Sequence, residues 1–135
     1  MSRVKLLSMI TTAFFIIVGL INFAPLMGIA SNDMLASLYA IEINSPDMSL
    51  LLRHRAALFG IVGGYILVAA VRPSHRPVAT VMAFASMLSF MVLYLLIGPA
   101  NNKLVGVFRI DVVAVILLIA AVILDRREQN ITPAQ

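Results

Sequence analysis

The chain has 135 residues, of which 61% are hydrophobic and only 12% are charged. A water-soluble domain carries roughly 25% charged residues, and a domain this small has too little interior to bury so much apolar surface, so a soluble globular protein is excluded. The net charge of +4 comes mainly from Lys and Arg at the ends of apolar runs, which argues against nucleic-acid binding, and the absence of cysteine excludes disulfides and thiolate metal sites.

The first apolar run covers residues 6–29 and follows the basic residues Arg3 and Lys5. It is longer than the roughly 7–15-residue core of a secretory signal. It also exceeds the length of about 20 residues that a membrane span needs, so it predicts a retained transmembrane helix. Asn22 and Pro25 near its far end predict a kink or a frayed last turn.

The next segment, residues 32–42, has apolar side chains at amphipathic spacing and predicts a short helix along the membrane surface, with Ser31 or Asn32 as its N-cap. The second span, residues 46–71, then begins with a strong helix start. Ser45 is a favoured N-cap, Pro46 is tolerated at the first helical position, and Asp47 suits the positive end of the helix dipole.

A basic loop bracketed by Pro73 and Pro77 ends the second span, because proline cannot continue a helix. The third span is predicted over residues 78–97 and the fourth over residues 104–124. The polar tail, residues 128–135, is expected to fray. Small residues are expected to let the helices approach closely, namely Ala56, Gly60, Gly63 and Gly64 in the second span and Ala79, Ala83 and Ser86 in the third.

Orientation follows from the basic residues outside the apolar runs. One side of the membrane has Arg3, Lys5, Arg72, Arg76, Arg126 and Arg127, and the other has only Lys103. The positive-inside rule therefore predicts that both termini are cytoplasmic. The predicted fold class is all-α: residues 1–135 form one integral membrane domain, an up-down bundle of four transmembrane helices.

Five ionisable side chains interrupt the apolar runs, namely Arg53, His54, Arg55, Arg109 and Asp111. Such residues are costly in a bilayer and usually face the bundle interior or the interface. At 1.5 Å per helical residue, Arg55 and Asp111 lie about 13 and 12 Å from the non-cytoplasmic face, and Asn22 about 9 Å. The pattern predicts one polar layer in that half of the membrane and almost purely apolar cytoplasmic halves. Arg55 is the preferred partner of Asp111, with Arg53 and Arg109 as alternatives.

This polar layer has two interpretations. It is either a buried ion pair that sets helix register, or a cavity that binds an anionic or polar-headed amphiphile. In the second interpretation His54 is an acid/base group or a hydrogen-bond partner of a quinone, whereas His75 is expected to be solvated in its loop. The candidate ligand-binding residues are Asn22, Arg53, His54, Arg55, Arg109 and Asp111. No catalytic motif and no metal-ligand spacing is present, so neither a catalytic residue nor a metal site is predicted.

Two short motifs support a family resemblance. They are Leu52-Arg53-His54-Arg55-Ala56-Ala57-Leu58-Phe59-Gly60 in the second span and Arg109-Ile110-Asp111 in the fourth. The chain resembles small four-span bacterial membrane proteins of the DoxX-like kind, in particular a subgroup with an LLRHRAxLFG-type motif. The resemblance implies the bacterial inner membrane and, by analogy with relatives linked to quinone-dependent oxidation, a redox accessory role.

Three functions remain open from the sequence. The leading hypothesis is a protein that is not itself an enzyme and that binds a lipid-like or quinone-like amphiphile in the outer half of the bundle; a quinone is the only cofactor considered. The alternative is a structural or accessory subunit of a larger membrane complex, for example a redox complex, with another protein or a second copy as partner. The third is a small membrane enzyme that uses His54 and Asp111.

Overall fold

The computed structural model describes residues 2–131, and these residues form helices and loops without any strand. Four of the helical stretches are long and apolar enough to cross a membrane, which confirms the all-α fold class and makes the chain a multi-pass membrane protein. The elements in order are α1 (Arg3–Phe23), η1 (Ala24–Ile29), α2 (Asn32–Tyr39), α3 (Pro46–Val71), η2 (Pro73–His75), α4 (Arg76–Ile97) and α5 (Asn102–Ile131).

Local signals in the sequence account for several of the helix ends. The Ser45 hydroxyl accepts a hydrogen bond from the Met48 backbone N–H and caps α3, and Ser31 caps α2 in the same way. The predicted irregularity near Pro25 is a change from α-helix to the 3₁₀-helix η1. These confirmed predictions depend on contacts between residues close together in the sequence.

Several boundaries differ from prediction: α1 starts at Arg3 rather than at residue 6, α2 ends at Tyr39 rather than at residue 42, and α5 starts at Asn102 rather than at residue 104. Two further differences involve proline and charged residues. Helix α4 starts at Arg76 rather than at residue 78, because Pro77 occupies the first turn, where its missing N–H costs nothing. Helix α5 does not end at Leu124 but continues to Ile131. The expected fraying is therefore wrong for residues 128–131, and residues 132–135 lie outside the described part of the chain. The charged residues after Leu124 end the apolar run without ending the helix.

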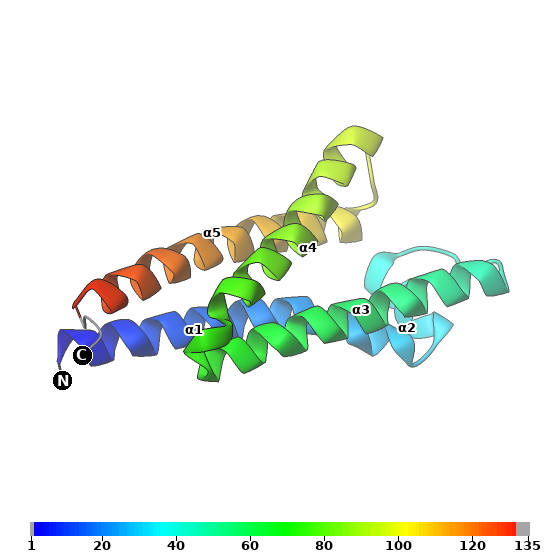
Figure 1. Cartoon of the computed structure of the whole chain (residues 1–135). Coiled ribbons are helices and arrows are strands. Elements are labelled where there is room, and N and C mark those ends of the chain that lie inside the picture. Colours follow the sequence, from blue (N-terminus) through cyan, green and yellow to red (C-terminus); the bar gives the residue numbers. More distant parts are fainter. Residues whose placement is uncertain (1, 132–135) are drawn as a thin grey trace.

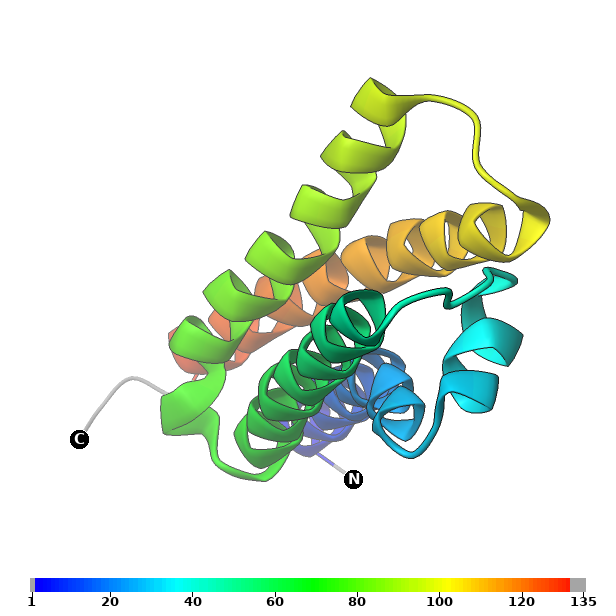
Figure 2. The same cartoon turned by 90° about the vertical axis from the view of Figure 1, so that its right-hand side faces the viewer.

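The helices run up and down, as Figure 1 shows, with α1 lying against both α3 and α5. We call the end with the start of α1, the turn η2 and the end of α5 the basic end, and the opposite end the distal end. Helix α4 packs against α3 and α5 near the basic end and diverges from them towards the distal end (Figures 1 and 2). Its buried residues accordingly stop at Met87.

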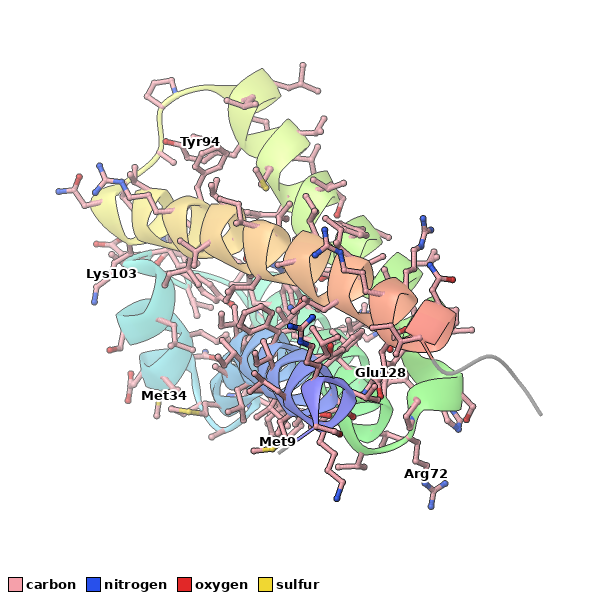
Figure 3. The ribbon with its side chains drawn as sticks, turned by 90° about the vertical axis from the view of Figure 1, so that its left-hand side faces the viewer. Met9, Met34, Arg72, Tyr94, Lys103 and Glu128 are labelled. Carbon is pink, nitrogen blue, oxygen red and sulfur yellow. The ribbon has the colours of Figure 1, made fainter. Side chains whose placement is uncertain are left out.

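The core is made largely of small side chains. Ala69, Ala79, Ala83, Ala114 and Ala121 are among its fully buried members, and large apolar side chains project outward along the whole molecule (Figure 3). This distribution suits a protein whose solvent is lipid, because close helix approach rather than large buried residues holds the bundle together.

Of the two neighbouring glycines predicted to allow close approach, Gly63 does so and Gly64 does not. A Cβ atom at Gly63 would lie 2.6 Å from the Phe23 Cα of α1. A Cβ atom at Gly64 would meet only the Phe23 ring, at 3.9 Å. Gly60 is buried as expected, whereas in α4 Ser86 is only half-buried and Met87 takes the buried position.

Candidate functional site

A cavity of about 360 Å³ lies towards the distal end of the bundle. Its walls come from α1, η1, α2, α3, α4 and α5, and most of the side chains that line it are apolar or aromatic. We call it the distal cavity. Its lining residues include Asn22, Tyr39, Phe59, Phe90, Lys103 and Asp111.

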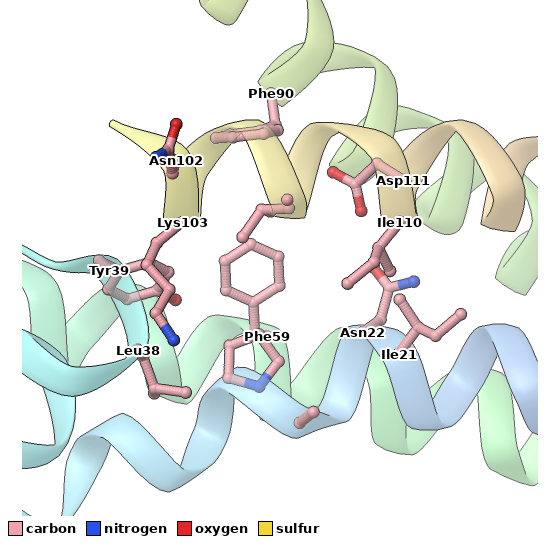
Figure 4. A pocket seen from close by; sticks show the side chains of 14 residues that line it. Ile21, Asn22, Leu38, Tyr39, Phe59, Phe90, Asn102, Lys103, Ile110 and Asp111 are labelled. Carbon is pink, nitrogen blue, oxygen red and sulfur yellow. The ribbon is translucent and has the colours of Figure 1, made fainter. Parts of the chain in front are cut away.

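One end of the distal cavity is polar. Asn22 from α1 and Asp111 from α5 lie there, and Figure 4 shows their side chains pointing towards one another. Asn22 is only 3% exposed, and its Nδ2 donates to the Val18 carbonyl oxygen of the same helix at 3.0 Å. The structure therefore brings together these two of the residues that the sequence assigned to one polar layer.

The other end of the cavity holds Tyr39 and Lys103, which the sequence analysis did not select (Figure 4). The Asn101 side chain donates to the Tyr39 carbonyl oxygen at 2.8 Å and so ties α2 to the start of α5. Burial raises the pKa of the Tyr39 hydroxyl, and the Arg55 charge opposes this in part. Tyr39 therefore keeps its proton near neutral pH. Lys103 lies in the first turn of α5, and its charge beside an apolar run was the sequence signal for this position.

Arg55 does not form the expected ion pair with Asp111. Its guanidinium lies instead over three aromatic rings, 5.2 Å from the centre of Tyr39, 5.1 Å from Phe59 and 5.8 Å from Phe90. Cation–π contacts of this kind stabilise a cation without an acid. Phe59 and Phe90 also line the distal cavity, so Arg55 lies behind the aromatic wall rather than in the cavity.

Arg53 lies on another side of α3 and connects this helix to η1 and α2. Its guanidinium donates to the Ile29 carbonyl oxygen at 3.3 Å and to the Asn32 side-chain oxygen at 3.2 Å. Ser49 donates to the same Asn32 oxygen at 2.6 Å. Arg53 thus holds η1 and α2 against α3, as expected for a residue about 200° around the helix from Arg55.

His54 and Arg109 are both exposed, and neither lines the distal cavity. In a membrane, an exposed arginine on α5 can extend along the helix to reach lipid head groups. Of the six candidate residues, Asn22 and Asp111 line the cavity and Arg55 lies behind its aromatic wall. Arg53 connects α3 to η1 and α2, and His54 and Arg109 are exposed on the outside.

Among residues 2–131 the most buried charged side chain lies near the basic end and was not predicted. Arg76 is 3% exposed and forms an ion pair with Asp125 of α5 at 2.5 Å. It also donates to the Thr12 hydroxyl of α1 at 3.2 Å, and its guanidinium lies 5.4 Å from the centre of the Phe15 ring. The pair lies just outside the predicted spans, residues 78–97 and 104–124, so it adds a buried polar contact at the basic end without contradicting the almost purely apolar halves predicted there. Pro77 was the sequence signal for this position, because a proline in the first helical turn places Arg76 at the start of α4.

His75 is not simply solvated, as the sequence analysis expected. Its Nδ1 is 2.9 Å from the Tyr65 hydroxyl of α3, and the two rings meet edge to face. By contrast, the neighbouring Arg72 is exposed, and its side chain extends away from the helices (Figure 3). The basic loop thus combines one outward cation with two residues that hold helices together.

Comparisons with protein-family models, with curated proteins and with solved structures found no match to this chain. The DoxX-like resemblance consequently stays a prediction that depends on the two sequence motifs.

Proposed function

We propose that this membrane protein binds a lipid-like or quinone-like amphiphile in the distal cavity. The cavity volume of about 360 Å³ lies within the range of small-molecule sites. Aromatic and aliphatic side chains form most of the wall, which suits an apolar body, and a few polar groups gather at its ends. Ligand sites commonly combine these two features.

The observation that carries the proposal is that Asn22 and Asp111 lie together at the polar end of the distal cavity. No residue in the described part of the chain forms a salt bridge with Asp111 or donates to its carboxyl oxygens. A polar group left without a partner in an apolar environment costs free energy, and a bound polar head would remove that cost. Because His54 lies on the outside, the proposal gives it no role and includes no catalytic step.

A second candidate function is an accessory subunit in a larger membrane complex. The observation that favours it is the diverging distal half of α4, where Leu95, Leu96 and Ile97 are 69%, 77% and 80% exposed. Lipid alone can cover such a face. A partner protein that co-purifies in fixed stoichiometry would favour this second function.

The proposed setting is the bacterial inner membrane with the basic end in the cytoplasm. The bacterial assignment depends on the DoxX-like resemblance. The orientation is supported by the positive-inside rule, since the basic end holds the Lys and Arg residues Arg3, Lys5, Arg72, Arg76, Arg126 and Arg127. In this orientation the distal cavity lies in the outer half of the membrane.

The test of amphiphile binding uses native mass spectrometry of protein extracted in a mild detergent. Gly106 lines the cavity and a Cβ atom there would meet nothing within 4 Å, so Gly106→Phe places a ring in the cavity without a backbone clash. Wild-type protein should carry a bound small molecule that Gly106→Phe loses. The matched control is Val113→Phe on the exposed side of the same helix, which should retain the molecule. A wild-type protein without a bound molecule, or one whose bound molecule persists in Gly106→Phe, would contradict the proposal.

A further inference from the structure

The direction of the Asn22 amide determines what it offers to a ligand. Its Nδ2 donates to the Val18 carbonyl oxygen at 3.0 Å. The reverse orientation would place the amide oxygen against that carbonyl oxygen, and two acceptors cannot form a hydrogen bond. The amide oxygen Oδ1 is therefore the atom left for the cavity, and it is an acceptor.

Asp111 adds a second set of acceptors at the same end of the cavity (Figure 4). An ionised carboxylate only accepts hydrogen bonds, and a protonated one still has an oxygen that accepts. The polar end therefore presents an excess of acceptors in either protonation state. Within residues 2–131 no side chain or backbone N–H donates to either Asn22 Oδ1 or the Asp111 carboxyl group.

We infer that the ligand carries a hydroxyl group at its buried end, which donates a hydrogen bond to Asp111 or Asn22. This inference depends on the proposed function, because it specifies the chemistry of the same site. A ligand carbonyl or ether oxygen at this position could accept only from the O–H of a protonated Asp111. Beside an ionised Asp111 it would face acceptors alone and would lose the hydrogen bond that it made with water.

A hydroxyl group also fits the surrounding charges better than an ammonium group. Lys103 lines the same cavity, and Arg55 lies behind the Phe59 and Phe90 wall. A second cation would be repelled by both. Lys103 and Asp111 are separated by about 12 Å along α5, so the apolar body of the ligand extends past the aromatic side chains towards Lys103.

The experiment compares two probes that differ only in the donor, para-hexylphenol and its methyl ether. Purified protein is equilibrated with each probe at the same free concentration, and occupancy is measured by native mass spectrometry. A hydrogen bond to a carboxyl or amide oxygen should favour the phenol by about tenfold or more in the wild type. This ratio is measured on unmodified protein, so it does not depend on the folding of any variant.

Two substitutions assign the preference to the polar end. Asn22→Leu removes one acceptor at similar volume and should reduce the preference for the phenol. Asp111→Asn introduces a donor, so the ether should gain occupancy and the ratio should fall towards one.

The outcomes separate this inference from the proposed function. Equal binding of phenol and ether by the wild type, with both lost in Gly106→Phe, would overturn the hydroxyl inference and leave amphiphile binding intact. Binding of both probes that is unchanged in Gly106→Phe would overturn the use of the distal cavity itself, and with it the proposed function.

Discussion

The basic and distal ends of the bundle differ in whether their charged side chains have partners within the protein. At the basic end Arg76 has an acid, a hydroxyl and an aromatic ring as partners, and these come from α5 and α1. At the distal end the described residues 2–131 provide no such partner for Asp111, although it lies in the same helix as Asp125. One carboxylate joins helices, and the other faces a cavity.

The divergence of α4 explains part of this difference. Near the basic end Arg76 anchors α4 against its neighbours, and the buried residues of α4 follow as far as Met87. Beyond that point contact with α5 includes the Tyr94 and Phe108 rings, whose centres are 4.6 Å apart. A cavity of about 290 Å³ also lies beside Arg76 and Asp125 at the basic end, but these two charges are paired with each other. The distal cavity differs because its carboxylate has no such partner within residues 2–131.

The largest expected effect comes from breaking the ion pair at the basic end. Asp125→Ala leaves the Arg76 guanidinium buried without its counter-charge, and removing one partner of such a pair costs about 3 kcal/mol of folding free energy or more. Thermal unfolding in detergent should therefore shift to a markedly lower temperature. Arg72→Ala is the control, because Arg72 is exposed in the same loop and should leave the unfolding temperature almost unchanged.

A double variant, Arg76→Met with Asp125→Leu, sharpens this first prediction. Replacing both partners by apolar residues removes the unpaired charge and should recover most of the lost stability. If Asp125→Ala unfolds at the wild-type temperature, the ion pair does not hold the basic end together.

The next effect tests the α1–α3 contact that connects the two ends. Gly63→Ala adds a methyl group against the Phe23 backbone and should cost about 1–3 kcal/mol, because a helix backbone cannot move aside as a side chain can. Gly64→Ala is the matched control, since its new methyl group meets only a ring at 3.9 Å. Chemical unfolding in detergent measures both; equal stability of the two variants would show that α1 and α3 are not closely packed at Gly63.

The smallest effect concerns the hydrogen bond between Tyr65 and His75. Tyr65→Phe removes the hydroxyl group while keeping the ring, so it should cost about 1 kcal/mol. The unfolding temperature should fall slightly, and occupancy of the distal cavity should stay at the wild-type level, because Tyr65 does not line it. A large loss of ligand occupancy would mean that the two ends are coupled.

Local chemistry explains why so much of the fold was predictable. The spans follow from runs of apolar residues, and the starts of α2 and α3 follow from Ser31 and Ser45, since a cap bonds to a backbone N–H three residues away. The helical rise also placed Asn22 and Asp111 at similar depth before their contact with one cavity was known. These features depend on neighbours in the chain or on the thickness of the membrane.

The sequence by itself therefore determined the apolar character of this protein, its four candidate spans and the positions of its polar residues along the helices. Only the tertiary structure decided which charges meet, because depth does not specify the angle at which a side chain leaves its helix or the tilt of the helix opposite. It placed Arg55 among aromatic rings and buried Arg76 against Asp125. It also left Asp111 facing a cavity, which makes that residue a candidate for ligand binding.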